Sequence, residues 1–147
     1  MTGRNGTDLV GRLGPNFATG LDYILPAKFT FKKPVLLLID ELAGSCGDII
    51  PMIMRDNGLA TLFGKRTMGL GGNVETGIVL PNSQATVKLT RGFFYTYSPT
   101  GTYDLNNPTE NNGVLPHIPY SHTVDDTRAG YVKYVNEFSK AAAALVK

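Results

Sequence analysis

Ser45 is the residue whose type and surroundings best suit it to act as a nucleophile. It lies in the run Gly44-Ser45-Cys46-Gly47-Asp48, between an apolar segment and the start of an expected helix. Such a turn lifts a side-chain oxygen out of a sheet, and free amides of Cys46 and Gly47 at the helix N-terminus could hold a developing oxyanion. The run differs from a Gly-x-Ser-x-Gly nucleophile elbow because Gly44 is adjacent to the serine. The alternative interpretation is that Ser45 only caps the helix.

The other chemical candidates have plainer interpretations. Cys46 is the only cysteine and has no basic neighbour to activate it, which favours a small packed residue over a nucleophile. The loop Gly69-Leu70-Gly71-Gly72 lacks the Lys-Ser/Thr ending of a phosphate-binding loop, so we interpret Gly69, Gly71 and Gly72 as a substrate-side loop. The aromatic residues of segment 93–97 either line a substrate cleft or form cross-strand pairs. No spacing typical of metal ligands occurs, so no metal or other cofactor is expected.

The residues on either side of the serine predict a β–α–β unit. Val35–Ile39 are five consecutive apolar residues, typical of a strand buried on both faces in mid-sheet. The helix is expected to have Asp48 as its N-cap, which places Pro51 at the third helical position, and to end at Gly58. Ala60–Phe63 are then expected to form a second strand, parallel to the first.

The rest of the chain predicts a mixed sheet and a C-terminal helix. Strands are expected at Val74–Leu80, Ala85–Thr90 and Phe93–Tyr97, with a turn at residues 81–84 between the first two. The polar run 98–112 is expected to be a long loop. The final helix, capped by Thr123 or Asp125, carries apolar residues near helical spacing, namely Val132, Val135, Phe138, Ala142 and Leu145.

The composition indicates one globular domain. Hydrophobic residues make up 42% of the chain and charged residues 18%, which excludes intrinsic disorder. The length of 147 residues leaves no room for a second full domain. The net charge of +2 comes without a long basic run, so nothing indicates binding to nucleic acid or to a membrane. No stretch reaches the roughly 18 consecutive apolar residues of a membrane span.

Three segments together resemble the core of the carboxyl-terminal processing (tail-specific) serine proteases. They are the apolar strand with its acidic end at residues 35–41, the run around Ser45 at residues 44–48, and Arg55–Gly69. Further details are similar to the chlamydial protease-like activity factor type: the acidic residue and the proline that follow the serine, the glycine loop, and Glu110–Ile118. The resemblance extends over residues 35–145.

The resemblance implies an α/β fold with a ClpP- and crotonase-like core, in which Ser45 attacks a peptide carbonyl and the Cys46 amide donates to the oxyanion. Many of these proteases activate the serine with a lysine in the glycine loop. Leu70 occupies that position here, and because an aliphatic side chain cannot accept a proton, a Ser–Lys dyad at this site is excluded. Lys65 and Arg66 belong to the preceding turn and are interpreted as solvated surface charges.

The chlamydial type instead implies a Ser–His–Glu triad. Glu110 matches the carboxylate that orients the histidine, although by itself it would be interpreted as a surface acid in a polar loop. His117 and His122 are the only histidines, and both follow Glu110 in a segment that is a structural turn in the family. We interpret them as turn or surface residues. The catalytic histidine and a second oxyanion donor are therefore expected in an N-terminal part of the same protease.

These observations predict a serine endopeptidase of the tail-processing type, which cleaves polypeptides through an acyl-enzyme at Ser45 and is incomplete as an isolated chain. Residues 1–34 are expected to be an irregular start that packs on the missing upstream half, and residues 35–147 the serine-bearing part of the catalytic domain. Two other classes stay open: a non-catalytic binding or assembly module of the same fold, and an acyl-CoA enzyme of the crotonase type. A periplasmic or extracellular location, and a homodimer formed through an exposed face, are further expectations.

Overall fold

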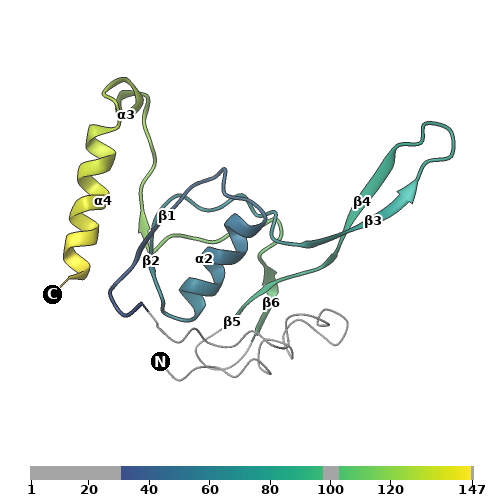
Figure 1. Cartoon of the computed structure of the whole chain (residues 1–147), viewed down its shortest axis with the longest axis horizontal. Coiled ribbons are helices and arrows are strands. Elements are labelled where there is room, and N and C mark those ends of the chain that lie inside the picture. Colours follow the sequence, from purple (N-terminus) through teal and green to yellow (C-terminus); the bar gives the residue numbers. More distant parts are fainter. Residues whose placement is uncertain (1–30, 98–102, 147) are drawn as a thin grey trace. The chain divides into compact units, whose positions relative to one another are not determined.

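The computed structural model of the chain describes residues 31–97 and 103–146 (Figure 1). The described helices and strands lie in a compact unit that begins at Pro34. The expectation for residues 1–34 falls almost wholly outside the described residues. In chain order the elements are β1 (Leu36–Ile39), α2 (Cys46–Asp56), β2 (Thr61–Gly64), β3 (Asn73–Val79), β4 (Thr86–Gly92), β5 (Tyr95–Tyr97), β6 (Tyr103–Pro108), β7 (Ile118–Pro119), α3 (Val124–Arg128) and α4 (Val132–Leu145).

A three-stranded parallel sheet holds the first strands together. Its order is β1-β2-β7, and Leu36 pairs with Thr61 at the start of the β1–β2 register. The predicted parallel β–α–β unit is therefore confirmed (Figure 1). The prediction that the first strand is buried on both faces in mid-sheet is wrong, because β1 is at the edge of the described sheet and Leu38 is 41% exposed. An apolar run in the sequence does not determine whether the strand it forms is central in a sheet or at its edge.

The core of this unit is small and combines residues of β1, α2 and β2 with Val114, which is distant in the sequence. Ile39 on β1, Met52 on α2, Leu62 on β2 and Val114 form its buried cluster. Leu37, Ala60 and Phe94 pack against that cluster. The helix that follows the serine is therefore held to the sheet by side chains from three separate segments.

Helix α2 begins earlier than the sequence predicts. Ser45 is its N-cap and Cys46 its first residue, so Asp48 lies in the first helical turn and is not the cap. Pro51 is consequently inside the helix, where it is buried. The predicted end is confirmed: Gly58 has φ 63°, its amide donates to the Arg55 carbonyl at 3.0 Å, and the next amide donates to the Met54 carbonyl at 2.8 Å. This is the Schellman arrangement that glycine favours.

The remaining strands form two antiparallel pairs. The predicted hairpin is confirmed as β3–β4, with a register shift between Thr76 and Ile78. The parallel and antiparallel strands lie in separate sheets, so the prediction of one mixed sheet is wrong for the described residues. The long loop at residues 98–112 is also wrong in part, because β6 lies within it and pairs with β5. Pairing with a neighbouring strand here overrides a polar sequence that has weak β propensity.

The C-terminal segment forms two helices where one is predicted. Thr123 caps α3 in a capping box with Asp126, so of the two predicted caps Thr123 is right and Asp125 is wrong. The break before α4 occurs at Gly130 and Tyr131, which have φ of 64° and 63°. Two successive left-handed residues cannot continue a helix. In the part of the chain that the structure describes, no helix combines the length and apolar character needed to cross a membrane.

Candidate active site

Ser45 occupies a strained turn between β1 and α2. Its backbone has φ 57° and ψ −116°, a conformation that non-glycine residues rarely adopt and that costs roughly 1–3 kcal/mol. The Ser45 carbonyl accepts the amides of Asp48 and Ile49 at 2.9 and 3.1 Å, whereas its side chain makes no capping hydrogen bond. The residue is exposed. The hydroxyl is thus left available at the surface, and the structure does not show the side-chain cap that was the alternative interpretation.

One of the two expected oxyanion amides is available. Cys46 opens α2, and among the described residues its amide has no hydrogen-bond acceptor. The Gly47 amide, by contrast, donates to the Gly44 carbonyl at 2.9 Å. The prediction of two free amides is therefore wrong for Gly47, because the turn that presents the serine consumes that donor. Cys46 itself is exposed, which does not fit the interpretation of a packed residue.

The glycine loop, residues 69–72, lies directly against the serine turn. The Met68 amide donates to the Ala43 carbonyl at 2.9 Å, and a Cβ placed on Gly44 would lie 3.6 Å from the Leu70 Cβ. The Asp48 carboxylate accepts the amides of Gly69 and Leu70 at 2.9 and 2.8 Å. The loop that the sequence associates with substrate is thus fixed at the start of the helix that follows Ser45.

Glu110 lies on the other side of the same loop. Its Oε1 accepts the Thr90 hydroxyl at 3.1 Å, and a Cβ placed on Gly72 would lie 2.8 Å from its Oε2. The next amide, of Asn111, donates to the Gly69 carbonyl at 2.7 Å. The turns that carry Ser45 and Glu110, which are 65 positions apart in the sequence, therefore both contact the same four-residue loop.

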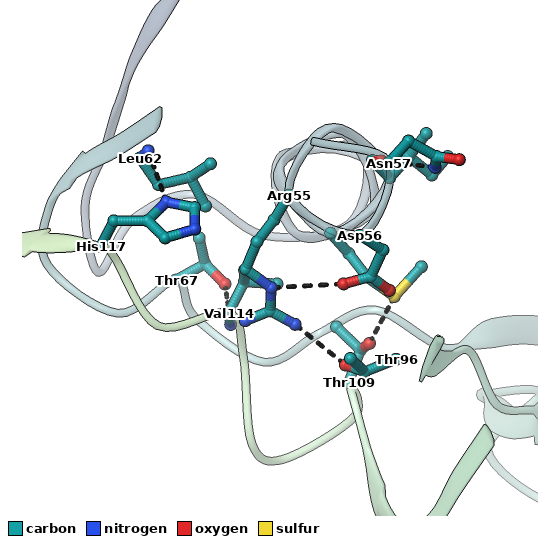
Figure 2. Close-up of polar contacts among 11 residues, drawn as sticks. Arg55, Asp56, Asn57, Leu62, Thr67, Thr96, Thr109, Val114 and His117 are labelled. Atoms are coloured by element: carbon teal, nitrogen blue, oxygen red, sulfur yellow. Dashed lines mark hydrogen bonds and ion pairs between the residues drawn. The ribbon is translucent and has the colours of Figure 1, made fainter. Parts of the chain in front are cut away.

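Neither histidine belongs to this group of residues. Figure 2 shows the His117 ring beside Leu62: its Nδ1 accepts the Leu62 amide at 2.9 Å, while the His117 amide donates to the Leu62 carbonyl at 2.9 Å. The ring thus replaces a backbone acceptor where β7 is too short to continue along β2. His122 packs among tyrosines, with its ring centroid 4.2 Å from that of Tyr134. His117 is held by hydrogen bonds and His122 by ring contacts, which agrees with their interpretation as turn or surface residues.

Buried threonines that the sequence analysis missed support the two loops. The Thr67 hydroxyl accepts the Val114 amide at 2.7 Å, and the Thr109 hydroxyl lies 3.0 Å from the Met52 sulfur (Figure 2). Thr67 and Thr109 are 1% and 2% exposed. In the sequence Thr67 lies just before the glycine loop and Thr109 just before Glu110, and such positions are too common to single out either residue.

The charged residues near the turn form an exposed pair. Lys65 donates to Glu41 at 2.6 Å, and this hydrogen bond holds the pKa of the Glu41 carboxyl below its usual value. Both residues border a shallow hollow of about 320 Å³, which Arg66, Thr67 and Met68 complete. Because its ammonium is paired, Lys65 is poorly placed to act as a base. No group of three or more potential metal ligands gathers anywhere in the described ranges.

Comparison with known proteins identifies the family. The model of peptidase family S41 matches residues 5–120. The chain belongs to peptidase family S41. A structure of mature CPAF, the chlamydial protease-like activity factor, complexed with lactacystin superposes with a TM-score of 0.68 at 33% identity, over 81% of this chain and 22% of that chain. The resemblance inferred from the sequence is therefore confirmed.

Relatives and a more distant structure complete the comparison. A Chlamydia pneumoniae protein is 38% identical over 112 residues, which cover 74% of this chain and 17% of the relative. A Chlamydia trachomatis protein is 33% identical over 132 residues, covering 86% of this chain and 20% of the relative. The chain thus spans about a fifth of the length of these relatives. The tricorn protease, with a TM-score of 0.60 and 22% identity, shares the α/β fold.

Proposed function

We propose that this S41 chain is the serine-bearing part of an endopeptidase of the tail-processing type. The observation that carries the proposal is the conformation of Ser45: an exposed residue, whose side chain makes no capping bond, on a strained turn at the start of a helix. Strain of this kind is retained where the surrounding structure enforces it, and it clusters at functional sites. A serine that served only as a cap would bond to the first helical turn.

In the proposed reaction the Ser45 oxygen attacks the carbonyl carbon of a peptide bond. Its proton passes to a histidine, and the Cys46 amide donates to the oxygen that becomes negative. Collapse of the tetrahedral intermediate breaks the C–N bond, the amine leaves with the histidine's proton, and an acyl-enzyme ester remains. Water then hydrolyses this ester by the same route. Glu110 would hold the histidine in the correct tautomer and stabilise its cation.

The histidine is proposed to come from the N-terminal part of the same protease. Two observations support this: the Nδ1 atom of His117 accepts the Leu62 amide, and His122 packs among tyrosines. The same proposal includes a ClpP- and crotonase-like core and a polypeptide substrate. It also includes a periplasmic or extracellular location and self-association into a dimer. The isolated chain is then expected to be inactive.

The test is hydrolysis of fluorescently labelled casein by the full-length product of the gene. Ser45→Ala is expected to lower kcat by about 10⁴-fold or more, and Glu110→Gln by about 10³-fold or more. Ser83→Ala, at an exposed serine in the turn between β3 and β4, serves as the control and should retain full activity. Full activity in Ser45→Ala would overturn the proposal. Casein that is bound but not hydrolysed by the unmodified protein would favour the non-catalytic binding module.

A further inference from the structure

We infer that Asp48 is a positioning residue of the proposed active site, fixing the glycine loop, and Glu110 with it, relative to Ser45. The inference rests on the proposed function for its catalytic consequence. Asp48 is fully buried, and its Oδ1 and Oδ2 accept the amides of Gly69 and Leu70 at 2.9 and 2.8 Å. Both carboxylate oxygens are thus used on two consecutive backbone donors of the loop.

This arrangement favours a carboxylate. The two amides meet separate oxygens of Asp48, and in asparagine one of these two positions would hold an NH₂ group, which donates and cannot accept. None of the ion pairs among the described residues involves Asp48. Its charge is instead stabilised by the loop amides and by its place in the first turn of α2, where the helix dipole favours an anion. A buried charge is costly, so its use to hold a loop indicates that the position of the loop matters.

The loop transmits this position to Glu110 because it is packed on both sides. A Cβ placed on Gly71 would lie 3.3 Å from the Asp48 Cβ and 2.7 Å from Thr109 Cγ2, while Gly72 is closed off in the same way by Glu110. The carbonyl of Gly69, whose amide is bound by Asp48, accepts the Asn111 amide. Asp48 and Thr109 therefore meet the loop at the same residue, Gly71, and Glu110 meets it at the next residue, Gly72. Ser45 lies three residues before Asp48, so this carboxylate sets the geometry between nucleophile and Glu110.

Amide exchange in the 147-residue chain tests the contact itself. The Gly69 and Leu70 amides are expected to be protected although they lie outside helices and strands, and to lose this protection in Asp48→Asn while the β1–β2 amides keep theirs. Asp125→Asn is the matched control, because Asp125 is also an acid in the first turn of a helix but is exposed and, among the described residues, its carboxylate pairs with Arg128 at 3.6 Å. Exchange of Gly69 and Leu70 at the rate of a free loop in the unmodified chain would overturn the inference.

Fluorophosphonate labelling of Ser45 in the full-length product tests the catalytic consequence. Asp48→Asn is expected to lower the saturating rate constant about 100-fold, the scale of a 1 Å misplacement, and to leave the half-saturating concentration within about twofold. Gly71→Ala retains Asp48 but displaces the loop, so it should also lower the rate constant and leave the half-saturating concentration nearly unchanged. This variant provides the test if Asp48→Asn does not fold. Normal labelling of either folded variant would refute the positioning role. If the unmodified protein is not labelled, the proposed function fails and with it the catalytic role, whereas amide exchange still decides whether Asp48 holds the loop.

Discussion

The serine-bearing unit, β1–α2–β2, and the β3–β4 hairpin are supported in different ways. In the first, Leu62 and Phe63 are 0% and 3% exposed; Leu62 packs in the buried cluster with Val114, and the Phe63 ring stacks on Tyr120. In the hairpin, Ile78, Val87 and Leu89 share one face and are 60%, 38% and 49% exposed. Its strands contact mainly each other, although its base reaches the site through Thr90 and Glu110. The proposed nucleophile is therefore on the part of the chain that tertiary contacts fix, whereas the hairpin depends on local pairing.

The largest difference in stability between the two regions is expected when a strand glycine in each is replaced by alanine. Gly64 has φ 126°, and a Cβ there would collide with the Ile39 carbonyl on the neighbouring strand, so Gly64→Ala should abolish cooperative folding. Gly77→Ala in the hairpin brings a Cβ to 3.0 Å from the Val87 carbonyl and should cost about 1 kcal/mol. Urea unfolding followed by circular dichroism measures both. Equal unfolding midpoints for the two variants would contradict the proposed difference between the two regions.

Truncation of a leucine should produce the next largest difference. Leu62→Ala removes a fully buried side chain and should lower the free energy of unfolding by about 2–5 kcal/mol. Leu89→Ala removes a side chain that is 49% exposed and should cost within about 1 kcal/mol. Chemical denaturation of both variants provides the values. A hairpin variant as destabilised as Leu62→Ala would mean that another surface covers the hairpin in solution.

Two isosteric threonine substitutions separate a buried hydrogen bond from an exposed hydroxyl. Thr67→Val leaves the Val114 amide buried without its acceptor, which should cost about 1–3 kcal/mol. Thr86→Val replaces an exposed hydroxyl on β4 and should change stability by about 0.5 kcal/mol or less. Thermal unfolding detects this gap. Its absence would show that Thr67 does not hold the segment before β7 to the loop after β2.

The smallest effect concerns the exposed ion pairs of the two regions. Lys65 lowers the pKa of Glu41, so Lys65→Met should raise this pKa toward its ordinary value. A lowered pKa in the folded state stabilises the protein above the unfolded pKa, and the contribution disappears as the pH falls through the folded value. A carboxyl NMR titration of Glu41 should show the change in Lys65→Met and none in Arg91→Met, which breaks the exposed hairpin pair with Glu75. Identical Glu41 titrations in all three proteins would contradict this account.

Features encoded by neighbouring residues were predictable from the sequence. The hairpin, the parallel pair and the helix end at Gly58 all follow from short patterns. Gly130 makes the same kind of helix end, with the Tyr131 amide donating to the Asp126 carbonyl at 2.7 Å. The analysis missed it because the apolar spacing beyond it continues into α4. Periodicity alone does not show where one helix stops and the next begins.

Features that depend on distant segments could not be predicted in this way. Whether β1 is central or peripheral depends on its neighbours in the sheet, and β6 exists because β5 lies beside it. Asp48 was placed by its type at a helix start, yet its partners are more than 20 residues away. For the site, the sequence identified Ser45 and Glu110 as candidates, but only the structure shows that the same glycine loop contacts the surroundings of both.

The most direct test of the central claim is the intact mass of the full-length product after incubation with a fluorophosphonate probe, with Ser45→Ala as the control. The account predicts one adduct per chain on Ser45, no adduct in Ser45→Ala, and none on the isolated 147-residue chain, which has no histidine at the proposed site. Labelling of the isolated chain would show that His117 or His122 completes the site and would contradict the proposed triad. A full-length product that stays unlabelled would contradict the claim that Ser45 is a nucleophile.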